Sequence, residues 1–181
     1  MAVGVVGLRA AVAVALADSA AAVEASVAAV RAEVGDLMRT REFLSRLEHD
    51  RIVEAIRQAE SKTSAEIRVF IQRGKLQPDP LVAAQKKFHH LGMHRTAERN
   101  GVLIFVAPRA HKFAILGDEA IHQKCGEELW QQLVDKMRDH FRNEKFSHAL
   151  VEAIEEAGKA LASHFPKKST SSELPDEVIE G

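Results

Sequence analysis

Four residues with oxygen-bearing side chains are the strongest candidates for chemistry: Glu66, Asn100, Asp118 and Glu119. Each lies at or beside an end of a predicted strand. If the first two strands are parallel and the third is antiparallel to the second, these ends meet at one rim of the sheet. Carboxylate and amide oxygens are the ligands that Ca²⁺ and Mg²⁺ prefer. The sequence therefore predicts a Ca²⁺ or Mg²⁺ site at this rim, where the metal would orient a phosphate for attack by water.

The same residues also fit structural roles. Asp118 precedes a predicted helical turn and would cap it, and Asn100 supplies turn geometry before Gly101. Arg99 would pair with a nearby carboxylate. The sequence leaves both interpretations of the rim open.

A second group of metal-ligating side chains follows the third strand. Asp118, His122 and Cys125 are spaced i, i+4 and i+7, which places them on one helical face, and their types suit zinc. A fourth ligand is missing nearby, and Gly126 interrupts the helical pattern. The alternative is that Cys125 is a small core residue and His122 is a surface or capping side chain.

A third group is the histidine cluster His89, His90 and His94. It lacks the glutamate of the His-Glu-x-x-His hydrolase pattern, and we expect all three side chains to be solvated. The chain also lacks a nucleophile elbow and a phosphate-binding glycine loop. The common acyl-transfer and nucleotide-hydrolysis classes are therefore disfavoured.

The central element that positions these groups is an apolar run at residues 102–107, bounded by Gly101 and Pro108. Six consecutive apolar residues indicate a strand covered on both faces. Four turn-type residues separate this strand from a second, shorter run at residues 112–116 (KFAIL), which is apolar after its first residue. This is the spacing of an antiparallel hairpin. Residues 67–71 alternate as a first strand. A helix from Asp79-Pro80 makes the connection a crossover, so the first two strands should be parallel.

Amphipathic helices are predicted before and after these strands. A capping box at Ser45 and Glu48 opens the first helix. Two more helices follow the hairpin, and Ser147 would cap the second of them. The resulting fold class is α/β: a small mixed sheet flanked by helices in the order αβαββαα.

Both ends of the chain differ from this central part. Residues 1–37 form an Ala/Val-rich N-terminal extension, with three interpretations: a signal peptide within residues 1–22, a helix for self-association, or a peripheral segment. The helical seam would contain Leu16, Ala20, Val23, Val27, Val30, Val34 and Leu37. Residues 166–181 are a polar flexible tail, in which Leu174-Pro175 and Val178-Ile179 could dock on another surface.

The amino-acid composition indicates which classes of partner and which cellular compartment to expect. Twenty-five Lys and Arg residues nearly balance 26 Asp and Glu residues, so nucleic acid is not expected as a partner. A single cysteine excludes an intrachain disulfide framework. No run reaches the ~18–20 apolar residues of a transmembrane anchor. These features favour a cytoplasmic protein; the alternative is export, if residues 1–22 are a signal peptide.

Three segments carry a family resemblance: residues 65–71 (AEIRVFI), 99–106 (RNGVLIFV) and 115–121 (ILGDEAI). With the order αβαββαα, they make residues 41–165 resemble the TPM domain family, which includes thylakoid-lumen phosphatase-like proteins and many bacterial proteins. The resemblance implies a three-layer sandwich. It also implies roles proposed for the family, as weak acid phosphatases, divalent-metal binders or assembly factors.

Two functions follow from these observations. The first is a binding or assembly module for a protein partner, with a divalent-metal site at the rim. Its docking surface would be a sheet edge, a helix surface or the Leu174-Pro175-Asp176 part of the tail. The alternative is a weak metal-dependent acid phosphatase that acts on phosphomonoesters.

Overall fold

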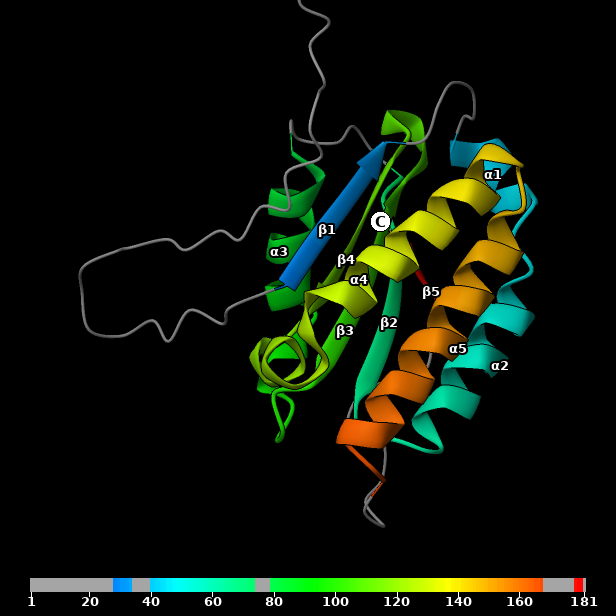
Figure 1. Ribbon diagram of the computed structural model, residues 1–181. Coiled ribbons are helices and arrows are strands. Elements are labelled where there is room, and N and C mark those ends of the chain that lie inside the picture. The colour runs from blue at the N-terminus through cyan, green and yellow to red at the C-terminus, as the bar shows by residue number, and fades with distance from the viewer. Residues whose placement is uncertain (1–27, 34–39, 74–78, 168–177, 181) are drawn as a thin grey trace, which may run out of the picture.

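The computed structural model describes residues 28–33, 40–73, 79–167 and 178–180 of the chain. Its centre is a mixed five-stranded sheet in the order β1-β4-β3-β2-β5 (Figure 1). The strands are β1 (Ala28–Glu33), β2 (Glu66–Ile71), β3 (Gly101–Ala107), β4 (Lys112–Gly117) and β5 (Val178–Glu180). The helices are α1 (Thr40–Ser45), α2 (His49–Glu60), α3 (Pro80–His90), α4 (Glu119–Arg142) and α5 (Phe146–His164). Two short 3₁₀ helices, η1 (Met93–Arg95) and η2 (Pro108–Ala110), flank β3.

The three predicted strands have the predicted directions. β2 and β3 are parallel, with Glu66 opposite Gly101, and β3 and β4 are antiparallel, with Val102 opposite Gly117. α3 makes the crossover between β2 and β3, and Asp79 caps it by accepting a hydrogen bond from the Leu81 amide at 2.8 Å. The start of β2, the start of β3 and the end of β4 therefore lie at one end of the sheet.

Helices cover both faces of the sheet, which confirms the predicted three-layer sandwich (Figure 1). Alternate residues along each strand face opposite layers. Val69 and Ile104 pack in the core formed with α2, α4 and α5, whereas Phe70 and Phe105 pack in a second core with α3. In the part of the chain that the structure describes, no helix combines the length and apolar character needed to cross a bilayer.

The N-terminal extension contributes a strand that the sequence did not predict. Residues 28–33 form β1, which pairs antiparallel with β4, with Val30 opposite Ile115. The helical interpretation is therefore wrong for Val30. β-branched residues such as valine are favourable in strands as well as in the seam of a coiled coil. The edge of β4 has backbone groups available for pairing, and residues 28–33 form a strand there. The other seam residues and residues 1–22 lie outside the described part of the chain.

The tail also contributes a strand. Val178–Glu180 form β5, which pairs in parallel with β2, with Val69 opposite Val178. The expectation of a wholly flexible tail is therefore wrong for these three residues. A free sheet edge can hold a short apolar segment whose composition alone would not predict order.

The predicted caps at Ser45 and Ser147 are wrong. Ser45 is the last residue of α1, and the N-cap of α2 is Glu48, which makes no side-chain cap hydrogen bond. Instead, the Glu48 amide donates to Ser147 Oγ at 2.9 Å. Ser147 lies inside α5, whose N-cap is Lys145. This serine thus joins two helices that are far apart in the sequence, which local patterns cannot reveal.

Candidate functional site

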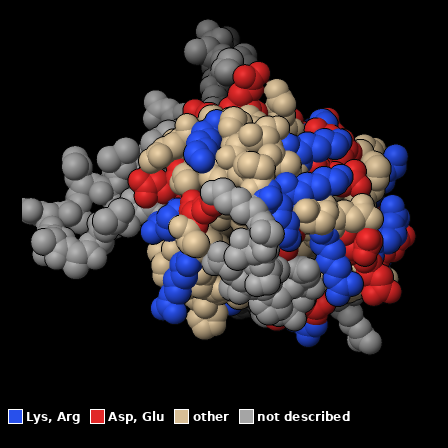
Figure 2. Space-filling model, turned by 90° about the horizontal axis from the view of Figure 1, so that it is seen from below, with Lys and Arg blue, Asp and Glu red and all other residues tan. Residues whose placement is uncertain are grey.

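Asn100 and Asp118 lie together at the predicted rim. The Asn100 side chain donates from Nδ2 to Ser64 Oγ at 3.2 Å, which ties the start of β3 to the segment before β2. The Asp118 amide donates to the Gly101 carbonyl at 2.9 Å. The sheet therefore brings these two rim residues to one end of the molecule. Seen from below, the described surface carries Lys and Arg interspersed with Asp and Glu (Figure 2).

Asp118 is fully buried and its carboxylate already has partners. Arg99 donates from Nε to Oδ2 at 2.9 Å and from Nη2 to Oδ1 at 3.0 Å. The Glu119 amide donates to Oδ1 at 2.8 Å, so Asp118 also caps α4. The hydrogen bond with Asp118 raises the pKa of Arg99. A cation at this carboxylate would have to compete with the Arg99 guanidinium.

The other two rim residues make contacts away from Asp118. Glu66 is buried and its Oε2 accepts from Arg68 Nη2 at 3.2 Å. Arg68, itself 2% exposed, also donates to Glu60 Oε1 at 3.1 Å. Glu119 is half-buried and accepts a hydrogen bond from the Gln123 side chain at 3.2 Å. Glu66 therefore belongs to a buried ion-pair network with Arg68.

The proposed zinc face is interrupted. Gly126 has a φ of 70° and breaks α4 one residue after Cys125. His122 Nδ1 is buried without a hydrogen-bond partner among the described residues. Cys125 is half-buried and packs against the core, and burial raises the pKa of its thiol.

The histidine cluster is solvated only in part. His89 and His90 are exposed, as expected, but His94 is half-buried and its ring centroid lies 4.7 Å from that of His89. Within the described structure, His94 Nδ1 is buried without a hydrogen-bond partner. Burial, followed by the neighbouring His89, lowers the pKa of His94. The expectation that His94 is solvated is therefore wrong, because η1 folds it back against α3.

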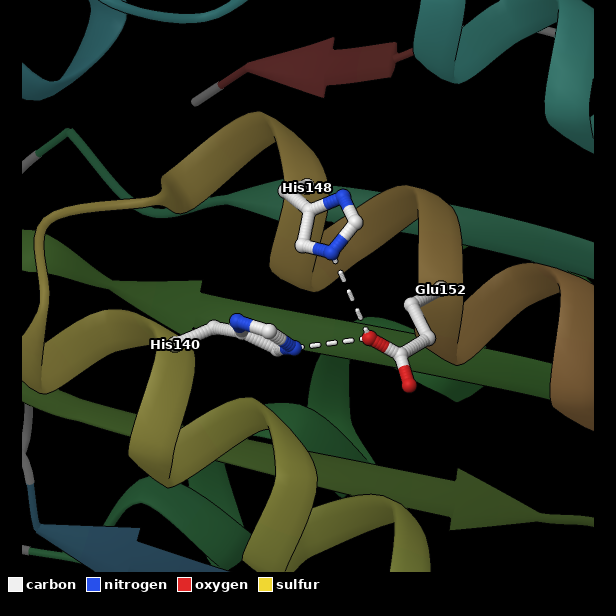
Figure 3. Close-up of side chains that lie close together, drawn as sticks. All are labelled: His140, His148 and Glu152. Atoms are coloured by element: carbon white, nitrogen blue, oxygen red, sulfur yellow. Dashed lines mark hydrogen bonds and ion pairs between the residues drawn. The ribbon is translucent and has the colours of Figure 1, made fainter.

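A different cluster meets the geometric requirement for a metal. Among the described residues, the one group of three or more His, Cys, Asp or Glu side chains with ligand atoms within 4.8 Å of one another is His140, His148 and Glu152. Both imidazole rings point toward the Glu152 carboxylate (Figure 3). His140 Nε2 lies 2.7 Å and His148 Nε2 lies 3.6 Å from Glu152 Oε2.

Two packed helices hold this cluster. His140 lies in the last turn of α4, and His148 and Glu152 are one turn apart on α5. The two helices are joined by a tight turn in which Glu144 has a φ of 57°. Phe141 and Phe146 flank that turn, are buried, and have ring centroids 5.5 Å apart. The helical hairpin therefore positions the cluster on a rigid core.

Basic residues surround the Glu152 carboxylate. Lys136 Nζ lies 3.4 Å from Glu152 Oε1 and 3.8 Å from Glu156 Oε2. Burial acts to raise the pKa of Glu152, but hydrogen bonds from His140 and Lys136 outweigh it, and the pKa is lowered. Glu152 is therefore held as a carboxylate.

Sequence reasoning missed this cluster. The i, i+4 spacing of His148 and Glu152 was visible and could have been noted. His140 is eight residues before His148, and its approach depends on how α4 packs on α5. That packing is a tertiary feature that spacing alone does not give.

Two comparisons with known proteins give a match, one to a family model and one to a solved structure. A family model described as the TPM domain matches residues 37–160. Among solved structures, the chain is similar to the NMR structure of the BA42 protein from the psychrophilic bacterium Bizionia argentinensis. The two sequences are 39% identical, and the two structures superpose with a TM-score of 0.69. That match covers 74% of this chain and 92% of that chain. Comparison with curated proteins gives no match.

Proposed function

This chain belongs to the TPM domain family, and from that premise we propose that it is a protein-binding module whose docking site is the β2 edge of the sheet. The ligand is an extended segment of a partner protein with two apolar residues followed by an acidic one. The observation that carries this proposal is the pairing of the chain's own β5 with β2. Adding a strand to a sheet edge is a common mode of peptide recognition.

The side chains of the first two residues of β5 lie on opposite faces of the sheet. β5 pairs in parallel with Val69–Ile71 of β2. Val178 packs against the core under α2, α4 and α5, whereas Ile179 packs against the core under α3. Alternation of this kind gives side-chain specificity to an added strand, because each residue meets a different apolar surface.

The third residue of β5, Glu180, is held by contacts of its carboxylate with His49 and Arg73. Glu180 Oε1 lies 3.0 Å from His49 Nε2 at the start of α2, and its Oε2 pairs with Arg73 just after β2. The Glu180 side chain is 19% exposed, whereas that of Arg73 is 57% exposed. A carboxylate at this position therefore fixes the register of the incoming segment.

Exchange of β5 for a partner segment is energetically accessible. β5 is three residues long, and each backbone hydrogen bond contributes only about 1 kcal/mol net. Burial of its side chains is partial, since all three residues are of intermediate exposure. A partner segment with the same pattern can therefore compete for β2.

A peptide-binding measurement tests this proposal with the full-length chain. In the variant V178D/I179D, the tail should leave β2, because carboxylates replace both apolar contacts. A labelled peptide of residues 174–181 (LPDEVIEG) should then bind the variant, measured by fluorescence anisotropy, and bind the wild-type chain more weakly. Adding Arg73→Ala should weaken binding, whereas the exposed control Lys159→Ala should not. A folded V178D/I179D variant that does not bind the peptide would refute the proposal.

The rim supports the alternative function, a weak metal-dependent phosphatase acting on phosphomonoesters with Ca²⁺ or Mg²⁺. Its support is that Asn100 and Asp118 meet at one end of the sheet. The competition of Arg99 for the Asp118 oxygens makes it the weaker of the two proposals.

A further inference from the structure

We propose that His140, His148 and Glu152 form a binding site for a divalent transition-metal ion of the zinc type. This site is separate from the sheet rim and from the β2 edge. It uses two imidazole nitrogens and one carboxylate oxygen, all within 4.8 Å of one another.

The ligand types select the metal. Imidazole nitrogen suits zinc, nickel, copper and cobalt, whereas Ca²⁺ and Mg²⁺ prefer oxygen ligands and often several of them. Two histidines with one glutamate are a known ligand set for zinc. The site should therefore discriminate against Ca²⁺ and Mg²⁺, in contrast to the rim.

The distances are close to those that a metal requires. Ligands bound at about 2.0–2.1 Å in tetrahedral geometry lie roughly 3.3 Å from one another. The contact from His140 Nε2 to Glu152 Oε2 is 2.7 Å and would lengthen, while that from His148 Nε2 is 3.6 Å and would shorten. Both changes are within reach of side-chain rotation, so the helices need not move.

The backbone is already organised for binding. α4 and α5 are fixed by the buried Phe141 and Phe146 beside their connecting turn. The entropy cost of bringing the three ligands together is therefore met on folding rather than on metal binding. A site with prepositioned ligands binds more tightly than the same residues on a mobile segment.

The site is open to solvent on one side. The side chains of His140, His148 and Glu152 are 24%, 55% and 27% exposed. Three protein ligands leave a fourth tetrahedral position for water or an exchangeable ligand. Metal can therefore enter and leave without unfolding.

Lys136 competes with the metal for Glu152. Its ammonium group lies 3.4 Å from Glu152 Oε1 and is repelled by a bound cation. Replacing Lys136 with glutamine should therefore strengthen metal binding. If the cluster were only a structural salt bridge, Lys136→Gln would not increase the affinity for a metal ion.

The test is a Co²⁺ and Zn²⁺ titration of the untagged full-length protein, followed by visible absorption and calorimetry. Wild type should bind one metal ion, with the strong visible bands of low-coordinate Co²⁺. His148→Ala and Glu152→Gln should each weaken binding by about tenfold or more. Lys136→Gln should bind more tightly.

Matched controls separate this site from other histidines. His90→Ala and Glu155→Gln remove exposed side chains outside the cluster and should bind like wild type. His148 is 55% exposed, so its loss should leave the fold intact, as circular dichroism would verify. No binding by wild type, or unchanged binding by His148→Ala, would overturn the proposal.

Discussion

The Arg99 guanidinium binds the buried Asp118 carboxylate through two hydrogen bonds, of 2.9 and 3.0 Å. Asp118 also accepts from the Glu119 amide at the start of α4. This arrangement ties the start of β3 to the end of β4 and to the following helix. The rim is thus a structural junction whatever else it binds.

The first prediction concerns the stability of this junction. Asp118→Ala removes the helix cap and leaves Arg99 without its partner, so it should lower the free energy of unfolding by about 1–3 kcal/mol. The Arg99 side chain is 35% exposed, which keeps the penalty below that of a fully buried ion pair. Denaturant unfolding measures the change. Asp118→Asn retains an oxygen for the cap and should lose less; a larger loss for Asn than for Ala would contradict this account.

The second prediction tests chemistry at the rim. If the rim binds Ca²⁺ or Mg²⁺ and supports phosphomonoester hydrolysis, Asp118→Asn should abolish both while retaining the fold. Calorimetry with each cation and turnover of a generic phosphomonoester are the measurements. Asn100→Ala should weaken binding through loss of an amide oxygen. Turnover unchanged in Asp118→Asn would remove the phosphatase alternative.

The third prediction concerns the pH dependence of stability through His94. Burial lowers the pKa of His94, with smaller contributions from His89, Arg95 and Arg99, while Asp118 acts to raise it. The unfolded chain therefore binds a proton at this residue more readily than the folded chain does. The free energy of unfolding should be highest above the unfolded pKa of about 6.5 and fall as pH drops below it. NMR titration should give a midpoint below 6.5 for the His94 ring.

A variant pair isolates this contribution. His94→Gln should flatten the loss of stability between pH 7.5 and pH 5, because the titrating group is gone. His90→Gln, at an exposed position on α3, should leave the wild-type slope unchanged. Equal slopes for wild type and His94→Gln would show that this histidine is not linked to folding.

The fourth prediction concerns Cys125. Burial raises the pKa of its thiol, so little thiolate is present at neutral pH. Alkylation by iodoacetamide at pH 7.5 should be several-fold slower in the native protein than in the unfolded chain. Mass spectrometry of timed samples measures both rates. Equal rates would mean that the thiol is as accessible and acidic as in a free peptide.

The core of the fold was predictable from local patterns. The apolar run 102–107, the hairpin after it and the Asp79-Pro80 helix start each depend on neighbouring residues, and they gave the correct strand directions. The two edge strands were not predictable in this way. β1 and β5 become strands because β4 and β2 offer edges for pairing, and neither segment has a strand pattern distinct from its surroundings.

The candidate sites also include some contacts that local sequence patterns predict and others that depend on tertiary packing. The predicted strand directions were enough to place Asn100 and Asp118 at the same end of the sheet. The sequence also suggested that Arg99 would pair with a carboxylate. It did not identify Arg68 as the partner of Glu66, or His140 as the neighbour of Glu152. Those contacts depend on side-chain direction and helix packing, which residue spacing does not determine.

The central claim, that the β2 edge takes an extended apolar-apolar-acidic segment, is tested most directly by hydrogen exchange of full-length protein. Amides of Val178–Glu180, and those amides of Val69–Ile71 that point toward β5, should be protected in the wild type and should exchange faster in V178D/I179D. The β2 amides that donate to β3 should be unaffected, because that pairing does not depend on β5. Adding the peptide of residues 174–181 should restore protection to the β5-facing amides of Val69–Ile71 in that variant. If those amides remain equally exposed at saturating peptide, or if the variant exchanges like the wild type, the β2 edge is not the docking site.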